Sequence, residues 1–296
     1  MSAYDWILNS EGHNIGFTLF GLSIRWYALI ILFGALLALY VSNYRAHKRG
    51  LPNDVFDSVF LWAFPGGIVG ARIWYVIATW PGENGSTQFI DDFTNVFKIW
   101  QGGLAIQGGA IGGILTGILV ILIRRKGWNL LDALDCSVPT ILIGQIFGRW
   151  GNFMNQEVYG VAISDPSSWG FLGVLMERMN IAGSYRVPLF FLESVLNIGG
   201  YFLITRAVPY LENRHYRIGD QAFMYFVWYG IVRMILEPLR DPKFNMGADN
   251  GGNTGIVNSM QAVWMGLAFV IIGLVAILLN HLIPYFLEKK KKSVKE

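Results

Sequence analysis

The stretch Gly148-Arg-Trp-Gly-Asn-Phe-Met-Asn-Gln-Glu-Val-Tyr-Gly160 places an arginine, carboxamides and a glutamate directly after an apolar run. That run, from Cys136 to Phe147, contains no charged residue. A guanidinium without a role costs several kcal/mol in hydrocarbon, so an arginine at this depth usually marks a site. Because arginine binds phosphate through paired hydrogen bonds, Arg149 is a candidate ligand for a lipid phosphate.

The composition around this stretch indicates a membrane protein. Of the 296 residues, 53% are hydrophobic and 15% are charged, whereas a soluble domain carries about 25% charged residues. The apolar runs are long enough to cross roughly 30 Å of hydrocarbon. We therefore predict an all-α, polytopic protein that forms a single integral membrane domain over residues 1–296. Seven spans are expected, at residues 24–44, 56–77, 104–123, 133–153, 188–204, 222–236 and 257–279.

Basic residues predict the orientation of these spans. They collect at alternate ends of the spans, at 45–49, 124–126, 206–217 and 289–295. Since such residues favour the cytoplasmic side, we expect an extracytoplasmic N-terminus and a cytoplasmic C-terminus. Segment 1–23 and the loop 157–187 then lie outside the cell, and the basic tail 288–296 lies in the cytoplasm. The net charge of +3 reflects this topology, so we expect no nucleic-acid partner.

The glycines and the cysteine have structural interpretations. Gly66, Gly67 and Gly70 fall in the second predicted span, and a series from Gly102 to Gly117 leads into the third. In a membrane such spacing lets helix backbones approach closely. Cys136 is the chain's one cysteine, so no internal disulfide can form, and a buried packing residue is favoured over a nucleophile.

Three further arginines lie within or beside spans. Arg25 is close enough to a span end to reach the interface. Arg72 fits a structural and a functional role equally well. Arg233 shares a helical face with Tyr229 and Glu237, four residues to either side, which predicts an Arg233–Glu237 ion pair. That pair is either a structural contact or one wall of a site.

These segments together resemble the prolipoprotein diacylglyceryl transferases. The stretch Gly148–Gly160 is similar to the signature of that family. Segments similar to its other motifs follow the family order, at Arg25-Trp-Tyr27, Gly70-Ala-Arg-Ile73, Trp100–Gly109 and Tyr229–Arg240.

The resemblance implies a transferase of the bacterial cytoplasmic membrane, with its site on the extracytoplasmic side. It would move the diacylglyceryl group of phosphatidylglycerol to the lipobox cysteine thiol of a prolipoprotein and release glycerol phosphate. This reaction is the first step of lipoprotein maturation. Phosphatidylglycerol, prolipoprotein signal peptides and membrane lipids are the expected partners, and no metal or other cofactor is implied.

The site expected from the motifs combines arginines, carboxamides and acids. We expect Arg149 and Arg233 to hold the phosphate and either Glu157 or Glu237 to orient an arginine or accept the thiol proton. The expected catalytic residues are Arg149, Arg233, Glu157, Glu237 and Tyr229. The expected phosphatidylglycerol-binding residues are Arg149, Asn152, Asn155, Arg233, Tyr27, Gln107 and Arg72.

Two positions depart from the family pattern. The family motif usually carries His-Gly-Gly, where this chain has Gln107-Gly108-Gly109, and it often has tyrosine where Leu192 stands before Glu193. A carboxamide cannot shuttle a proton. Gln107 is therefore expected to bind a polar group, and Arg149 is expected to contribute most to catalysis in place of a histidine.

Three alternatives remain open. The Gln107 departure could mark a family member with weakened or altered activity that still binds lipid. A transporter or channel would need paired acids along several spans, and the predicted spans contain few carboxylates. A structural scaffold gains little from several arginines buried in lipid.

Overall fold

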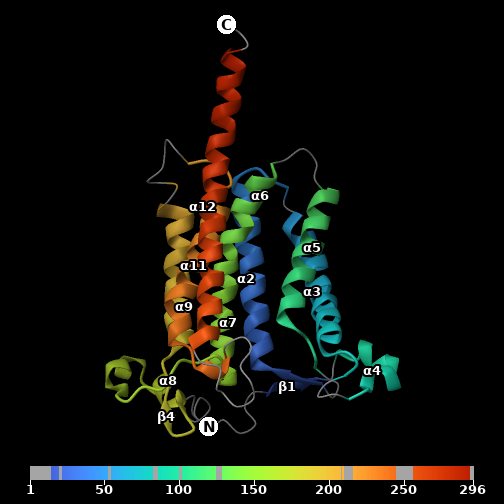
Figure 1. Ribbon diagram of the computed structural model, residues 1–296, viewed down its shortest axis with the longest axis vertical. Helices are drawn as coiled ribbons and strands as arrows, with labels where there is room; N and C mark the ends of the chain where they lie inside the picture. Colours follow the sequence, from blue (N-terminus) through green and yellow to red (C-terminus); the bar gives the residue numbers. More distant parts are fainter. Residues whose placement is uncertain are drawn as a thin grey trace. The chain divides into compact units, whose positions relative to one another are not determined.

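The computed structural model describes residues 15–19, 22–52, 55–82, 86–99, 102–124, 129–207, 209, 216–244 and 256–293. These residues are mostly helical, as predicted (Figure 1). The chain divides into two compact units, one formed by residues 1–41 and 130–296 and the other by residues 42–129. Their union into one membrane domain stays a prediction.

The larger unit contains the signature stretch and most of the helices. Its elements are β1 (Ile15–Leu19), β2 (Leu22–Arg25), most of α2 (Trp26–Lys48), α6 (Leu130–Ser137), η4 (Val138–Thr140), α7 (Ile141–Asn155), η5 (Pro166–Leu172), α8 (Val174–Arg178), β3 (Asn180–Ile181), β4 (Ser184–Tyr185), α9 (Leu189–Phe202), η6 (Leu203–Ala207), α11 (Asp220–Leu236), η7 (Glu237–Leu239), η8 (Pro242–Phe244) and α12 (Ile256–Ser293). The unit of residues 42–129 contains the end of α2, α3 (Val55–Thr79), α4 (Gln88–Asp91), η2 (Phe93–Phe97) and α5 (Ile106–Arg124).

Six helical segments are long and apolar enough to cross a membrane. They are Trp26–Lys48, Phe56–Thr79, Leu130–Asn155, Leu189–Ala207, Asp220–Leu239 and Ala262–Phe286. The remaining predicted span coincides with α5, of which the apolar part Ile111–Ile123 is shorter. The helices therefore lie where the sequence predicts them, while the count of seven spans and the orientation stay predictions. The two short hairpins, β1–β2 and β3–β4, were not predicted.

Large apolar side chains cover the outer faces of these helices. Leu61 on α3, Ile123 on α5 and Leu274 on α12 are all more than half exposed, and many other apolar side chains on these helices are exposed as well. A soluble protein rarely exposes contiguous apolar surface on this scale. The surface therefore suits hydrocarbon as its solvent.

The predicted glycine packing is confirmed between α3 and α5. A Cβ atom added to Gly70 would fall 2.4 Å from the carbonyl oxygen of Gly108 and 2.8 Å from the Cα atom of Gly112. The same kind of contact joins α11 to α12, where a Cβ atom at Gly230 would lie 2.4 Å from the carbonyl oxygen of Gly266. Small residues thus bring the backbones of each pair together.

The segment after α7 folds over the end of the helices in its own unit. A cluster of buried apolar side chains joins α7, η5, α8 and α9, comprising Phe153, Tyr159, Leu172, Met176, Met179 and Phe190. Cys136, at the other end of the same helical run, is completely buried, as a packing residue should be. The cluster fixes the loop that carries Glu157.

Candidate active site

The signature stretch forms the end of α7 and a tight return of the chain. Gln156 closes the helix in the left-handed conformation with φ 52°, and Val158 has φ 54°. For a β-branched residue such as Val158 this conformation is an outlier that the surrounding structure must stabilise. The turn brings the backbone N–H of Glu157 to the carbonyl oxygen of Asn152, at 3.0 Å. Glu157 is therefore folded back toward the helix end.

The Glu157 carboxylate accepts hydrogen bonds from both predicted carboxamides. Nδ2 of Asn152 lies 3.1 Å from Oε1 of Glu157, and Nδ2 of Asn155 lies 3.4 Å from the same oxygen. The structure thus brings together three residues that the sequence placed in the site.

Arg149 joins this group to α9. Its Nε lies 2.8 Å from Oε2 of Glu193, and its Nη1 donates to Oδ1 of Asn152 at 3.3 Å. A continuous polar chain therefore runs from Glu193 through Arg149 and Asn152 to Glu157. Sequence reasoning placed Glu193 near membrane depth but did not identify it as the partner of Arg149.

A second group lies where α11 ends. Nη1 of Arg233 is 3.0 Å from Oε2 of Glu237, which confirms the predicted ion pair. Nη1 of Arg240 is 3.4 Å from Oε1 of the same carboxylate. The turn η7 explains this second contact, because residues three apart align on a 3₁₀ helix. Arg240 was missed as a site residue, although its spacing of three from Glu237 was a usable signal.

The two groups lie within electrostatic reach of each other. Burial, followed by the neighbouring Arg233, lowers the pKa of Arg240 to about 10, and Arg149 contributes to the same shift. Glu237 and Glu193 oppose it. Arg240 still carries its charge at neutral pH. Three arginines and three glutamates thus share one region of the protein.

Several buried polar atoms of this region lack a hydrogen-bond partner among the described residues. They are Oδ1 of Asn155, Nε of Arg233 and Nε of Arg240. An unsatisfied buried donor or acceptor costs about 1–3 kcal/mol. Two cationic donors and one acceptor held in this state suit a ligand that carries an anion and a hydroxyl group.

The two predicted tyrosines have different surroundings. The ring of Tyr27 packs on the signature, since a Cβ atom at Gly151 would lie 2.9 Å from its Cδ2 atom. Tyr27 also lies within electrostatic reach of Arg149 and Glu157. Tyr229 lies one helical turn before Arg233 and packs its ring edge-on against Phe269, with the centroids 5.2 Å apart.

Arg72 and Gln107 belong to the unit of residues 42–129. The Arg72 guanidinium is buried and donates through Nε, Nη1 and Nη2 to four main-chain carbonyl oxygens. These belong to Asn95, Val96, Gly102 and Gly103, at 2.5 to 2.9 Å. These contacts favour the structural alternative for Arg72. Gln107 is the second residue of α5, and its side chain lies outside the described part of the chain.

Main-chain contacts tie the two polar groups of the site together. The N–H of Gly160 donates to the carbonyl oxygen of Val187 at 3.0 Å, and the N–H of Val161 donates to that of Leu239 at 2.9 Å. Gly160 and Arg240 are paired in an antiparallel bridge. The loop after Glu157 thus holds the backbone on which Arg240 stands.

Within the described ranges, no three acidic, histidine or cysteine side chains gather closely enough to hold a metal ion. The described residues of the site offer guanidinium, carboxylate, carboxamide and phenol groups.

Comparison with known proteins identifies the family of this chain. Residues 14–279 match the family model described as prolipoprotein diacylglyceryl transferase. A phosphatidylglycerol–prolipoprotein diacylglyceryl transferase of Streptococcus pneumoniae is 35% identical over 92% of this chain and 96% of its own length. Proteins of the same name from Streptococcus agalactiae and Streptococcus pyogenes are each 38% identical. The first match covers 86% of this chain and 91% of the relative, and the second covers 74% and 80%. The chain belongs to the prolipoprotein diacylglyceryl transferase family.

Proposed function

We propose that this protein transfers the diacylglyceryl group of phosphatidylglycerol to the lipobox cysteine thiol of prolipoproteins and releases glycerol phosphate. The observation that carries the proposal is the pairing of partly buried arginines with buried glutamates, Arg149 on Glu193 and Arg233 with Arg240 on Glu237. Family membership over most of the chain supports the same reaction.

The lipid phosphate binds between the two arginine groups. Glu193 and Glu237 hold the guanidinium groups in place, and Nε of Arg233 and of Arg240 are donors without a partner among the described residues. Charge-assisted hydrogen bonds to phosphate are about twice as strong as neutral ones. Their effect on the rate comes from stabilising the charge that develops on the leaving phosphate.

The carboxamides recognise the glycerol headgroup. Oδ1 of Asn155 is a buried acceptor with no partner in the described part of the chain, and a glycerol hydroxyl group would satisfy it. Asn152 is held between Arg149 and Glu157, so it stands next to the proposed phosphate position. The names of the relatives support phosphatidylglycerol as the lipid.

The transfer is a displacement at the glyceryl carbon. The cysteine sulfur forms a bond to that carbon, the bond from the carbon to the phosphate oxygen breaks, and its electron pair leaves with glycerol phosphate. The thiol proton must be removed, because the thiolate is the nucleophile. Glu237 already shares its negative charge between two arginines. Glu157, held by two neutral carboxamides, is therefore the candidate acceptor of the thiol proton. The proton then passes to the leaving glycerol phosphate.

The remaining predicted residues have supporting roles. Tyr27, packed on Gly151, and Tyr229, one turn before Arg233, line the lipid-binding region. Arg72 holds the segment 95–103 through its four carbonyl contacts. Gln107 binds a polar part of the lipid without acting as a base. The site opens to the extracytoplasmic side, where the lipobox of an exported protein is presented.

A transfer assay in proteoliposomes tests this function. The purified protein, phosphatidylglycerol and a lipobox peptide should yield a peptide that is heavier by one diacylglyceryl group, together with free glycerol phosphate. Phosphatidylethanolamine as the only lipid, or a peptide with serine in place of the lipobox cysteine, should give no product. Absence of product in the complete reaction would overturn the proposal. If no product forms but a substrate crosses the liposome membrane, the transporter alternative would be favoured.

A further inference from the structure

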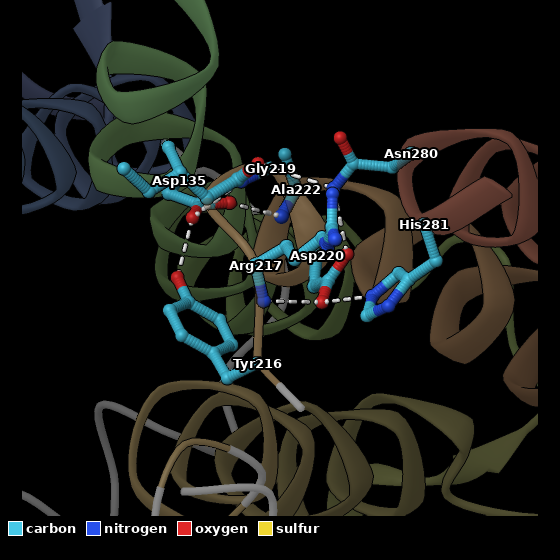
Figure 2. Close-up of polar contacts among 9 residues, drawn as sticks. Asp135, Tyr216, Arg217, Gly219, Asp220, Ala222, Asn280 and His281 are labelled. Atoms are coloured by element: carbon cyan, nitrogen blue, oxygen red, sulfur yellow. Dashed lines mark hydrogen bonds and ion pairs between the residues drawn. The ribbon is translucent and has the colours of Figure 1, made fainter. Parts of the chain in front are cut away.

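Asp135 is a completely buried carboxylate that the proposed reaction does not use. It stands on α6 and accepts three hydrogen bonds from the segment that opens α11 (Figure 2). Oδ2 accepts from the Tyr216 hydroxyl at 2.5 Å and from the Gly219 N–H at 2.8 Å, and Oδ1 accepts from the Ala222 N–H at 2.9 Å. A carboxylate can remain buried because these donors replace water. Asp135 therefore caps a helix that is more than eighty residues away in sequence.

A second carboxylate fixes the same end of α11 to α12. Asp220, also buried, accepts from Nδ2 of Asn280 at 2.9 Å and from the N–H of Arg217 at 2.8 Å. Nε2 of His281 lies 2.8 Å from Oδ2 of Asp220 (Figure 2). The beginning of α11 is thus held from α6 on one side and from α12 on the other.

The other ends of these helices carry the arginines of the site. The span Leu130–Asn155 leads from Asp135 to Arg149, and α11 leads from its cap to Arg233. Fourteen residues separate Asp135 from Arg149, and fourteen separate Gly219 from Arg233. At a rise of about 1.5 Å per residue, both distances are roughly 21 Å. The short turn η4 lengthens the first by about 1–2 Å.

We propose that Asp135 is a positioning residue that sets the axial register between the two arginine-bearing helices. Both helices are held by one carboxylate, and similar lengths of helix, roughly 21–23 Å, lead from it to Arg149 and to Arg233. This brings the two guanidinium groups to a similar depth, where both can contact one phosphate. This inference rests on the proposed function, because it assumes that both arginines serve a single phosphate.

Packing against α12 and polar contacts at its beginning both restrain α11. Gly230 and Gly273 bring α11 and α12 close along their length, since a Cβ atom at Gly273 would lie 2.8 Å from the carbonyl oxygen of Phe223. The side chains of Val270 and Val227 lie beside these two glycines, so this packing also resists sliding of α11 along α12. The polar contacts of Asp135 and Asp220 add an axial restraint at the beginning of α11, and the contacts of Asp135 act between α6 and α11.

A distance measurement tests the register without an activity readout. Spin labels on Ile141→Cys and Ile235→Cys report the axial offset of α7 and α11, and both positions are exposed. The native Cys136 is buried. Spin labelling of the chain without the two substitutions measures how much label Cys136 takes up. We expect one narrow distance in the otherwise unaltered chain and a shifted or broadened distribution in Asp135→Asn. If Asp135→Asn fails to fold, Tyr216→Phe takes its place; it removes one of the donors described above and should give a smaller shift.

Kinetics test whether the register matters for transfer. A displacement of about 1 Å at a reacting centre can cost a hundredfold in rate, so we expect kcat to fall about tenfold to a hundredfold in Asp135→Asn. The KM for the lipobox peptide should change less than about twofold, since the loss falls on the transition state. In combination with Arg233→Lys, Asp135→Asn should add little further loss, because both changes affect the same contact. Asp165→Asn removes an exposed carboxylate that also accepts a backbone N–H and should change neither readout.

Three outcomes overturn the inference. They are an unchanged spin-label distance in Asp135→Asn, an unchanged kcat in that variant, or losses that simply multiply in the double variant. If the unaltered chain transfers no lipid, the proposed function fails, whereas the spin-label distances still test the register by themselves.

Discussion

Arg149 and Glu193, forty-four residues apart in sequence, form an ion pair in which Nε lies 2.8 Å from Oε2. The Glu193 side chain is 8% exposed and that of Arg149 is 17% exposed. A contact at Nε holds one edge of the guanidinium and fixes its plane. The Nη groups then remain directed toward Asn152 and the proposed phosphate. Glu193 is accordingly the residue that orients Arg149.

Replacing Glu193 with glutamine should weaken both the fold and the reaction. Glutamine keeps an acceptor but leaves the Arg149 charge uncompensated, and removing one partner of a buried pair costs up to about 3–5 kcal/mol. We expect a lower unfolding temperature in detergent and a kcat reduced by at least about tenfold, because the guanidinium loses its fixed orientation. Glu177→Gln, at an exposed position, is the matched control. Equal kinetics for Glu193→Gln and Glu177→Gln would contradict the assigned role.

Removing the Arg149 side chain should abolish turnover. Loss of one donor that stabilises developing charge costs about a hundredfold to a thousandfold in rate, and Arg149→Ala also leaves Glu193 buried without its partner. Arg149→Lys keeps the charge but not the planar fork, so it should restore only a small part of the rate. Initial rates of glycerol phosphate release measure both variants. Full activity of Arg149→Ala would remove Arg149 from the site.

Gln107 offers a test of how this chain differs from the family pattern. Since a carboxamide does not act as an acid or base near neutral pH, Gln107→Ala should weaken transfer without abolishing it. Gln107→His adds a group that titrates between about pH 5 and 8. If position 107 contacts the lipid, the histidine variant should therefore acquire a new limb in its pH–rate profile. An inactive Gln107→Ala protein that folds normally would show that the carboxamide itself is essential.

The sequence predicted the helical spans and the site residues that are close in sequence. Apolar runs identified the helices, and the four-residue spacing predicted the Arg233–Glu237 contact that the structure contains. Glycine spacing predicted the close packing of α3 and α5. Each of these predictions rests on a local pattern with a helical period.

Long-range partners could not be predicted in the same way. Glu193 meets Arg149, and Asp135 meets Ala222, only after the helices have packed, and no spacing rule connects residues so far apart. The saturated contacts of Arg72 likewise depend on a loop more than twenty residues away. Arg240 is different, because its spacing of three from Glu237 was a local signal that the sequence analysis did not use.

Gly160 provides a test of how the loop after the signature supports Arg240. An added Cβ atom would lie 2.5 Å from Cβ of Val187 and 2.7 Å from the carbonyl oxygen of Leu239, so the backbone beside Arg240 must move. We expect Gly160→Ala to cost about 1–3 kcal/mol of stability, as overpacking does, and to lower kcat. At Gly170, where an added Cβ atom meets nothing within 4 Å, alanine should leave thermal unfolding and transfer kinetics unchanged. If Gly160→Ala is destabilised but keeps its kcat, the bridge to Arg240 supports the fold and does not position the arginine.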